Sequence, residues 1–440
     1  MNHEERLQFI WKNRLLPGSS LITTCGLEVE VSHPGEQNSH AGPDFFNARI
    51  KLGQMVWAGN VEMHHRASLW NHHRHHLDPA YDNVILHVVH QLDDLTKNSK
   101  GRIIPTLVVD PSKLQITLHE DLSTYENWLP CHSSISNVSK KSLEPWLATL
   151  YTERLNEKVH HASHILNRYP HNRDKALFLA LASGFGLPIN SLPFEIMASG
   201  IPLPLLMDIK EHLPLVEALL FGHSGLLNKT SKRDPYSTSL WKHYARLKEA
   251  LPGNPVPPHL WKFLRIRPAS FPTLRVAQFA SFIHFHFPLD EVFMNLESKR
   301  EIEQLLQLSA SEYWNTHYIF GRPSPHSVKT MGKQAIQHLI INAIIPFMVA
   351  NDPKNPKNDL LSDPGEIIRE LKPESNHIVK NWSDIGVVPG NAVESQALIQ
   401  LYNRYCTQQR CDECQIGRLL RHQFPNQNFQ LRKTISTDGT

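Results

Sequence analysis

The hydrophobic pattern of the sequence changes once, near residue 130, and this change sets the expected fold class. Before it, short apolar or alternating runs end at Gly, Pro or Asn, which is typical of strands. After it, apolar residues recur at helical spacing, interrupted by a Pro-rich linker at residues 251–260. The pattern predicts an α+β protein, with a small mixed-sheet domain at residues 1–130 and a large, mainly helical domain at residues 131–440.

The first 110 residues contain one helical pattern and several strand-like runs. Leu7, Ile10, Trp11 and Leu15 recur at helical spacing after an acidic start, which predicts an N-terminal helix. The runs expected to form strands are residues 27–31, 46–52, 55–64, 83–90 and 103–110. Gly53-Gln54 separates the second run from the third and predicts a tight hairpin turn. The expected order is helix, strand, hairpin, short helical stretch and strand.

Composition restricts the class of protein. The chain has 440 residues, of which 40% are hydrophobic and 20% charged, as in soluble globular proteins. Its net charge of +3 requires any basic surface for a polyanion to be local. The N-terminus does not resemble an export signal, and the longest apolar runs, at 177–187 and 339–350, are shorter than the roughly 20 residues of a membrane span. Five Cys is an odd number, which fits a reducing compartment. We therefore expect a cytoplasmic protein without a membrane partner, and its oligomeric state stays open.

Two acids are expected to meet in the strand-rich part. Alternation along a strand places Glu62 and His64 on one face, and the hairpin brings Asp44 alongside them. Two converging carboxylates repel each other unless a cation lies between them, and hard oxygen ligands suit Mg²⁺ or Mn²⁺. Such an ion could acidify a water molecule and stabilise charge on a phosphoryl oxygen, so the pattern favours a hydrolase.

Pro43-Asp44 together with Glu62-Met63-His64 resembles the signature of the PD-(D/E)XK nuclease superfamily, in which an acid, any residue and Lys follow Pro-Asp on the neighbouring strand. The resemblance implies a core of helix, three-stranded meander, helix and strand over about residues 1–110. It also implies metal-dependent hydrolysis of the phosphodiester bonds of DNA or RNA. His64 stands where the superfamily has Lys and cannot supply a fixed positive charge.

Other residues are candidates for the positive charge and the upstream acid that this signature lacks. Lys51 or Arg66 could supply the positive charge from a neighbouring position. The resemblance also implies an upstream acid, for which Glu36 is chosen over Glu28 and Glu30. The wider text, with GPDF, GNVEMH and HHLDPAYDNVILHVV, is similar to an uncharacterised bacterial family known only as a domain of unknown function, which implies no activity.

Histidines are concentrated beside these acids. The chain has 28 His, and residues 64–90 contain eight of them. If residues 68–76 form a helix, His72, His75 and His76 lie on one face and could bind phosphate or metal. With Asp78, His75 and His76 could instead form the zinc site of a hydrolase unrelated to nucleases. The alternative is a solvated His-rich surface, and His87, in an apolar strand, is expected to be a core histidine.

Three cysteines near the carboxyl end have metal-ligand spacing. Cys406, Cys411 and Cys414 form a C-x4-C-x2-C pattern in the segment 405–422, and His422 is the nearest fourth ligand. Cys25 and Cys131 are more remote options. The pattern predicts a structural Zn²⁺ or an iron–sulfur cluster, unless the thiols pack as small apolar groups.

The favoured function is that of a metal-dependent nuclease. Asp44 and Glu62 would hold Mg²⁺ or Mn²⁺, His64 would orient or deprotonate water, and His72 or His76 would contact phosphate. Basic and aromatic residues alternate at 261–268, which suits either nucleic acid or a solvated surface. The alternatives are a nucleic-acid-binding module that has lost cleavage and the zinc-dependent hydrolase.

Overall fold

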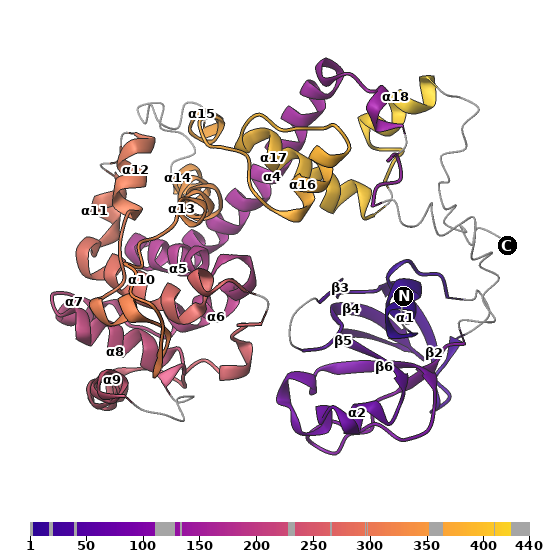
Figure 1. Cartoon of the computed structure of the whole chain (residues 1–440), viewed down its shortest axis with the longest axis horizontal. Coiled ribbons are helices and arrows are strands. Elements are labelled where there is room, and N and C mark those ends of the chain that lie inside the picture. The colour runs from indigo at the N-terminus through magenta and orange to yellow at the C-terminus, as the bar shows by residue number, and fades with distance from the viewer. Residues whose placement is uncertain are drawn as a thin grey trace. The chain divides into compact units, whose positions relative to one another are not determined.

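A computed structural model of the protein describes residues 3–423 except 17–20, 39–41, 111–127, 133, 228–233, 265, 295, 297, 352–363 and 409. The chain divides into two compact units, one of Met1–Asp121 with His259–Ile266, and one of Leu122–Pro258 with Arg267–Thr440. The first unit contains a mixed sheet and the second is largely helical (Figure 1). The α+β fold predicted from the sequence is therefore confirmed. The sequence did not indicate that residues 259–266 belong to the first unit.

One mixed sheet organises the described part of the first unit. Its strand order is β1-β2-β4-β5-β6-β7, and β3 pairs with β4. Strands β2, β4 and β5 are antiparallel neighbours, whereas β6 runs parallel to β5 and β7 parallel to β6. Gly53, with φ +60°, closes the β4–β5 hairpin that its sequence predicts. The elements are α1 (His3–Lys12), β1 (Leu21–Ile22), β2 (Glu28–His33), β3 (Glu36–Gln37), β4 (Phe45–Leu52), β5 (Met55–Arg66), α2 (Leu69–His72), η1 (His75–Leu77), η2 (Pro79–Tyr81), β6 (Val84–Gln91) and β7 (Thr106–Val108).

The two faces of β5 have different surroundings. Helix α1 packs Leu7 and Trp11 into a core that also contains Val61 and Met63. Because side chains alternate along a strand, the residues between them, such as Glu62, lie on the opposite face. On the side of the sheet that carries α2 and η2, Trp70 and Tyr81 form a smaller apolar cluster with Val84 and Ile104. The sheet thus separates an apolar core from a polar site.

The second unit is built from helices and a two-stranded sheet. Its largest described helix, α4, packs against α17 and α18 around a core that includes Trp146, Trp382 and Leu420. The elements are η4 (Ile135–Asn137), α4 (Lys140–Arg168), α5 (Arg173–Phe185), α6 (Leu187–Ser199), α7 (Leu203–Ile209), α8 (Leu213–His223), α9 (Pro235–Leu247), α10 (Pro272–His286), α11 (Leu289–Met294), α12 (Lys299–Leu306), β8 (His317–Ile319), β9 (Arg322–Pro323), α13 (Lys333–Leu339), η10 (Ile340–Ile344), α14 (Ile345–Asn351), α15 (Pro364–Arg369), α16 (His377–Asp384), α17 (Ala392–Gln400), η12 (Leu401–Cys406) and α18 (Gln415–Gln423).

One helical stretch of the described chain is long and apolar enough to cross a membrane. It spans Lys333–Asn351, and the bent pair Leu187–Ser199 and Leu203–Ile209 would be a second if taken as one span. This helical stretch is longer than the apolar run at residues 339–350 because it begins with α13, at Lys333. Within the protein, 61% of the apolar window of Lys333–Asn351 is buried, as in the core helix of a soluble protein.

Candidate metal centre

The site begins where β4 and β5 pair. Phe45 lies opposite Val61, so the residues beside them, Asp44 and Glu62, become neighbours. The Asp44 backbone N–H donates to Glu62 Oε2 at 2.9 Å, and the Met63 backbone N–H donates to Asp44 Oδ2, also at 2.9 Å. The structure thus brings together the two acids that the hairpin was expected to join.

Helix α1 contributes a third acid. Gln8 Nε2 donates to Asp44 Oδ1 at 2.8 Å, and the negative charge of Glu4 raises the pKa of both Asp44 and Glu62. Glu36, the upstream acid chosen from the sequence, lies exposed on β3 opposite Phe46. Glu4 and Gln8 are one helical turn apart, and this spacing is the sequence signal that could have identified Glu4.

Two histidines lie beside the carboxylate of Glu62, and a third lies beside one of these two. Glu62 Oε1 lies 3.5 Å from His64 Nε2 and 3.4 Å from His75 Nε2. His73 Nδ1 lies 3.2 Å from His64 Nε2. The candidate ligand nitrogens of His64, His73 and His75 all lie within 4.8 Å of one another. Tetrahedral donors about 2.0–2.1 Å from one ion stand roughly 3.3–3.4 Å apart. The His64–His73 pair lies close to this separation, and the other donor distances in the group are at most 4.8 Å, so these residues could hold one metal ion.

The ligand set differs from the one expected on a helix face. Helix α2 ends at His72, Arg74 adopts a left-handed conformation with φ +61°, and η1 begins at His75. This break removes the i, i+3, i+4 geometry and brings His73 and His75 to the same point. His72 and His73 are both exposed, but only His73 belongs to the group. His76 lies half-buried outside the group.

Asp78, the acid expected to bind metal together with His75 and His76, has a different role in the structure. The Asp78 side chain accepts a hydrogen bond from the Ala80 backbone N–H at 2.9 Å and so caps η2. Its charge raises the pKa of His75, against the larger effect of burial. Asp78 therefore acts on the site from a distance, and the predicted trio of His75, His76 and Asp78 is not assembled.

Buried neighbours hold the histidine rings in place. His87, fully buried as expected for a core histidine, brings Nε2 to 2.9 Å from Nδ1 of His64. If His64 Nδ1–H donates to His87, His64 Nε2 is left with a lone pair directed at Glu62 and His73. Tyr81 stacks on His75 with ring centroids 3.8 Å apart, and Trp70 contacts the same ring edge-on.

Burial sets the charge of the site. Burial and repulsion by Glu62 raise the pKa of Asp44 to about 7, and burial raises the pKa of Glu62 to about 8. Burial also lowers the pKa of His64 to about 2 and that of His87 to about 3. The imidazoles are therefore neutral, which is the form that binds metal. No positive charge among the described residues lowers the pKa of either carboxylate. A divalent cation fits both conditions.

This electrostatics predicts how the stability of the metal-free protein changes with pH. Folded Asp44 and Glu62 keep protons that the unfolded chain has released, so the free energy of unfolding falls as pH rises toward about 8. The lowered histidine pKa values have the opposite effect only below their ordinary value of 6.5. With EDTA present, the Tm measured by scanning fluorimetry is expected to fall between pH 6.5 and 8, and to fall less in Glu62→Gln. A Tm that rises across this window contradicts the prediction.

The basic residues proposed to replace the superfamily lysine lie elsewhere. Lys51 pairs with Glu30 across β4 and β2 at 3.7 Å, at the far end of β4 from Asp44. Arg66 is exposed at the end of β5 and acts electrostatically on His65 and Asp93.

Lys262, from the basic and aromatic run that the sequence offered as a nucleic-acid or solvated surface, lies nearer. The Lys262 ammonium is 5.7 Å from the centroid of the Phe46 ring. It is also 3.5 Å from the point that a Cβ on Gly42 would occupy, so it lies beside the segment that carries Asp44. Lys262 belongs to the basic and aromatic run at 261–268, of which the structure assigns 261–266 to the sheet unit.

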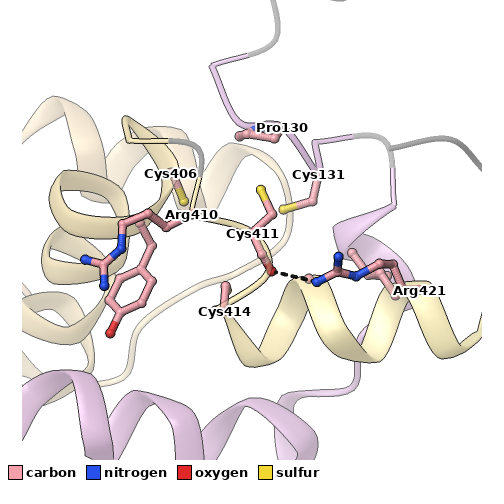
Figure 2. Close-up of a pocket in the computed structure, with 10 residues that line it drawn as sticks. Pro130, Cys131, Cys406, Arg410, Cys411, Cys414 and Arg421 are labelled. Atoms are coloured by element: carbon pink, nitrogen blue, oxygen red, sulfur yellow. Dashed lines mark hydrogen bonds between the residues drawn. The ribbon is translucent and has the colours of Figure 1, made fainter. Parts of the chain in front are cut away.

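The predicted cysteine ligands lie in the helical unit. Cys406, Cys411 and Cys414 line one cavity, and the fourth cysteine in its wall is Cys131 (Figure 2). His422 is exposed on α18 and does not line that cavity. Cys25 is exposed in the sheet unit.

Comparison with known proteins gives one match. A family model described as "Protein of unknown function (DUF2851)" matches residues 4–377, which include every residue of the His and Glu62 cluster. No curated protein and no solved structure matches the chain.

Proposed function

Since the chain belongs to the DUF2851 family, whose description assigns no activity, we propose from its site that the protein is a metal-dependent phosphodiesterase that cleaves nucleic acid. The observation that carries the proposal is the cluster of Glu62, His64, His73 and His75. Its neighbouring donor atoms lie 3.2, 3.4 and 3.5 Å apart, next to the half-buried Asp44.

The donor set favours a borderline cation. Three imidazoles and one carboxylate suit Zn²⁺ or Mn²⁺ better than Mg²⁺, which prefers oxygen ligands. This changes the expected ligands from Asp44 with Glu62 to Glu62 with three histidines. A divalent cation held there would supply Lewis acidity toward a phosphoryl oxygen and would acidify water.

Asp44 is the group best placed to move a proton. Its carboxylate is fixed by Gln8 and by the Met63 backbone N–H, and its pKa of about 7 matches the pH at which a general base works well. His64, in contrast, contacts Glu62, His73 and His87, so we assign it to holding the cation instead of deprotonating water.

Two observations support a nucleic-acid substrate. The elements of the sheet unit run helix, antiparallel strands, short helix and parallel strand, which is the order that the resemblance to PD-(D/E)XK nucleases implies. Lys262, beside Gly42 and Phe46, places a positive charge near Asp44, where a phosphate could be held. The alternative function is a binding module without cleavage, which the replacement of the superfamily lysine by His64 favours.

Incubation of the purified full chain with plasmid, single-stranded DNA and RNA tests the proposal. Each substrate is combined with Mn²⁺, Zn²⁺, Mg²⁺ or EDTA, and products are resolved on gels. We expect cleavage with Mn²⁺ or Zn²⁺ and none with EDTA. Retention of nucleic acid without cleavage under every condition would support the binding module and reject the phosphodiesterase.

Adjacent histidines provide a matched pair for the metal site. His73→Ala removes one donor of the cluster, whereas His72→Ala removes another exposed ring one residue away that lies outside the cluster. We expect His73→Ala to weaken Zn²⁺ affinity by about a hundredfold or more, and His72→Ala to change it little. Competition with a chromogenic chelator measures both. Equal affinities in the two variants would remove His73 from the ligand set, and the reverse order would restore the helix-face ligands expected from the sequence.

A further inference from the structure

The helical unit contains a second group of metal-ligating side chains that the proposed function does not use. Cys406 lies at the end of η12, and Cys411 and Cys414 lie in the turn before α18. Cys131, 275 residues before Cys406, lies ahead of η4 and α4. Figure 2 shows these segments converging on one cavity, with the sulfurs of Cys131, Cys406 and Cys411 pointing into it.

We propose that Cys131, Cys406, Cys411 and Cys414 form a four-thiolate metal centre that joins the start of the helical unit to its last helix. Four cysteines meeting in one cavity satisfy the ligand number of both Zn²⁺ and iron–sulfur centres. Cys131 takes the position of the fourth ligand, for which the sequence pattern predicted His422, a residue that is exposed on α18.

The surroundings of the sulfurs fit a bound cation. All four thiols line the same cavity, and Cys131, Cys406 and Cys411 each interact electrostatically with at least one other of the four. Backbone N–H groups of Ile416 and Gly417 donate to the Cys414 sulfur. Hydrogen bonds to sulfur of this kind accompany metal-bound thiolates. A cation would remove the repulsion that these thiolates would otherwise have.

The volume of the cavity and the shape of the backbone around it also fit a bound metal centre. The cavity has a volume of about 40 Å³, more than the roughly 10–15 Å³ that one water-sized body needs. Arg410 and Arg421 also line it and would offset the net negative charge of four thiolates, although each also pairs with an acid, Glu413 and Asp412. A Cβ at Gly417 would meet the Cys411 carbonyl oxygen at 2.2 Å, so the close turn around Cys411 requires glycine there.

The spacing of the sulfurs bears on which metal is bound. Among the described residues, only His64, His73 and His75 form a group with all donor atoms within 4.8 Å, so no three of these sulfurs are that close to one another. Sulfurs around one Zn²⁺, each about 2.3 Å from it, stand roughly 3.8 Å apart. The wider spacing favours an iron–sulfur cluster over a single Zn²⁺.

Metal analysis of the full chain purified without oxygen tests the centre. We expect iron and acid-labile sulfide in stoichiometric amounts with visible absorption, or one equivalent of Zn²⁺ without absorption if the sulfurs close around a single ion. Measurement in the His73→Ala background keeps the result separate from the proposed active site. A chain with intact fold and neither metal in stoichiometric amount would overturn the centre while leaving the phosphodiesterase untouched.

Single variants then test the ligands. Cys131→Ser is expected to lose the metal almost completely, whereas His422→Ala and Cys25→Ser, which change residues outside the cavity, keep it. Circular dichroism verifies that each variant is folded. Because loss of the centre in Cys131→Ser could also unfold the unit, chelation of wild-type protein followed by thiol titration is the second measurement. Four thiols should become reactive only after the metal is removed. Retention of metal in Cys131→Ser with loss in His422→Ala would overturn the assignment.

Discussion

Glu62→Gln is expected to reduce cleavage on the order of a hundredfold or more, and to weaken Zn²⁺ or Mn²⁺ binding, while the protein stays folded. The substitution keeps the size of the side chain and removes the charge that faces His64 and His75. Cleavage is measured with a labelled oligonucleotide at saturating metal, and binding by calorimetry on metal-free protein.

The Tm of Glu62→Gln shows whether the expected loss of cleavage results from loss of the charge or from unfolding of the protein. Burial raises the pKa of Glu62 to about 8, so its charged form costs free energy in the metal-free protein above that pH. The Tm of Glu62→Gln at pH 8.5 with EDTA is therefore expected to equal or exceed that of the wild type. Glu5→Gln, an exposed acid on α1, is the control for loss of a carboxylate. Full activity in Glu62→Gln would reject the site.

Trp11→Ala is expected to reduce the free energy of unfolding of the sheet unit by about 3–5 kcal/mol, the usual cost of removing a buried Trp. Trp11 is 1% exposed in the core between α1 and the sheet. Its indole N–H also donates to the Pro34 carbonyl at 2.8 Å. Because the same helix carries Glu4 and Gln8, we expect loss of cleavage as well.

Hydrogen exchange measured by mass spectrometry on the full chain reports the stability of this unit alone. Exchange protection of β5 and β6 amides should fall on the order of a hundredfold to several thousandfold in Trp11→Ala. Trp57→Ala is the matched control, because Trp57 is only half-buried against the same core and should cost about half as much or less. Protection unchanged in Trp11→Ala, or a larger loss in Trp57→Ala, would show that α1 does not hold the sheet.

Some of the site could be predicted because it depends on short-range geometry. Alternation on β5 places Glu62 and His64 on one face, and the Gly53 turn fixes the register that brings Asp44 to Glu62. The candidate residues that the structure places outside the site were chosen without knowing one backbone angle and several contacts between distant segments. Because Arg74 is left-handed, His73 joins the histidine cluster and His72 and His76 do not. Because α1 packs on the sheet, Glu4 is the acid whose charge acts on Glu62, and Glu36 lies apart.

By itself, the sequence determined the α+β division, the strands around the β4–β5 hairpin and the meeting of Asp44 with Glu62. These follow from side-chain periodicity and turn chemistry, which act over a few residues. Only the tertiary structure decided that His73 joins His64 and His75, that Lys262 lies beside Gly42, and that Cys131 faces Cys411. Those contacts join segments whose approach depends on how the whole core packs, and no local pattern in the sequence records that packing.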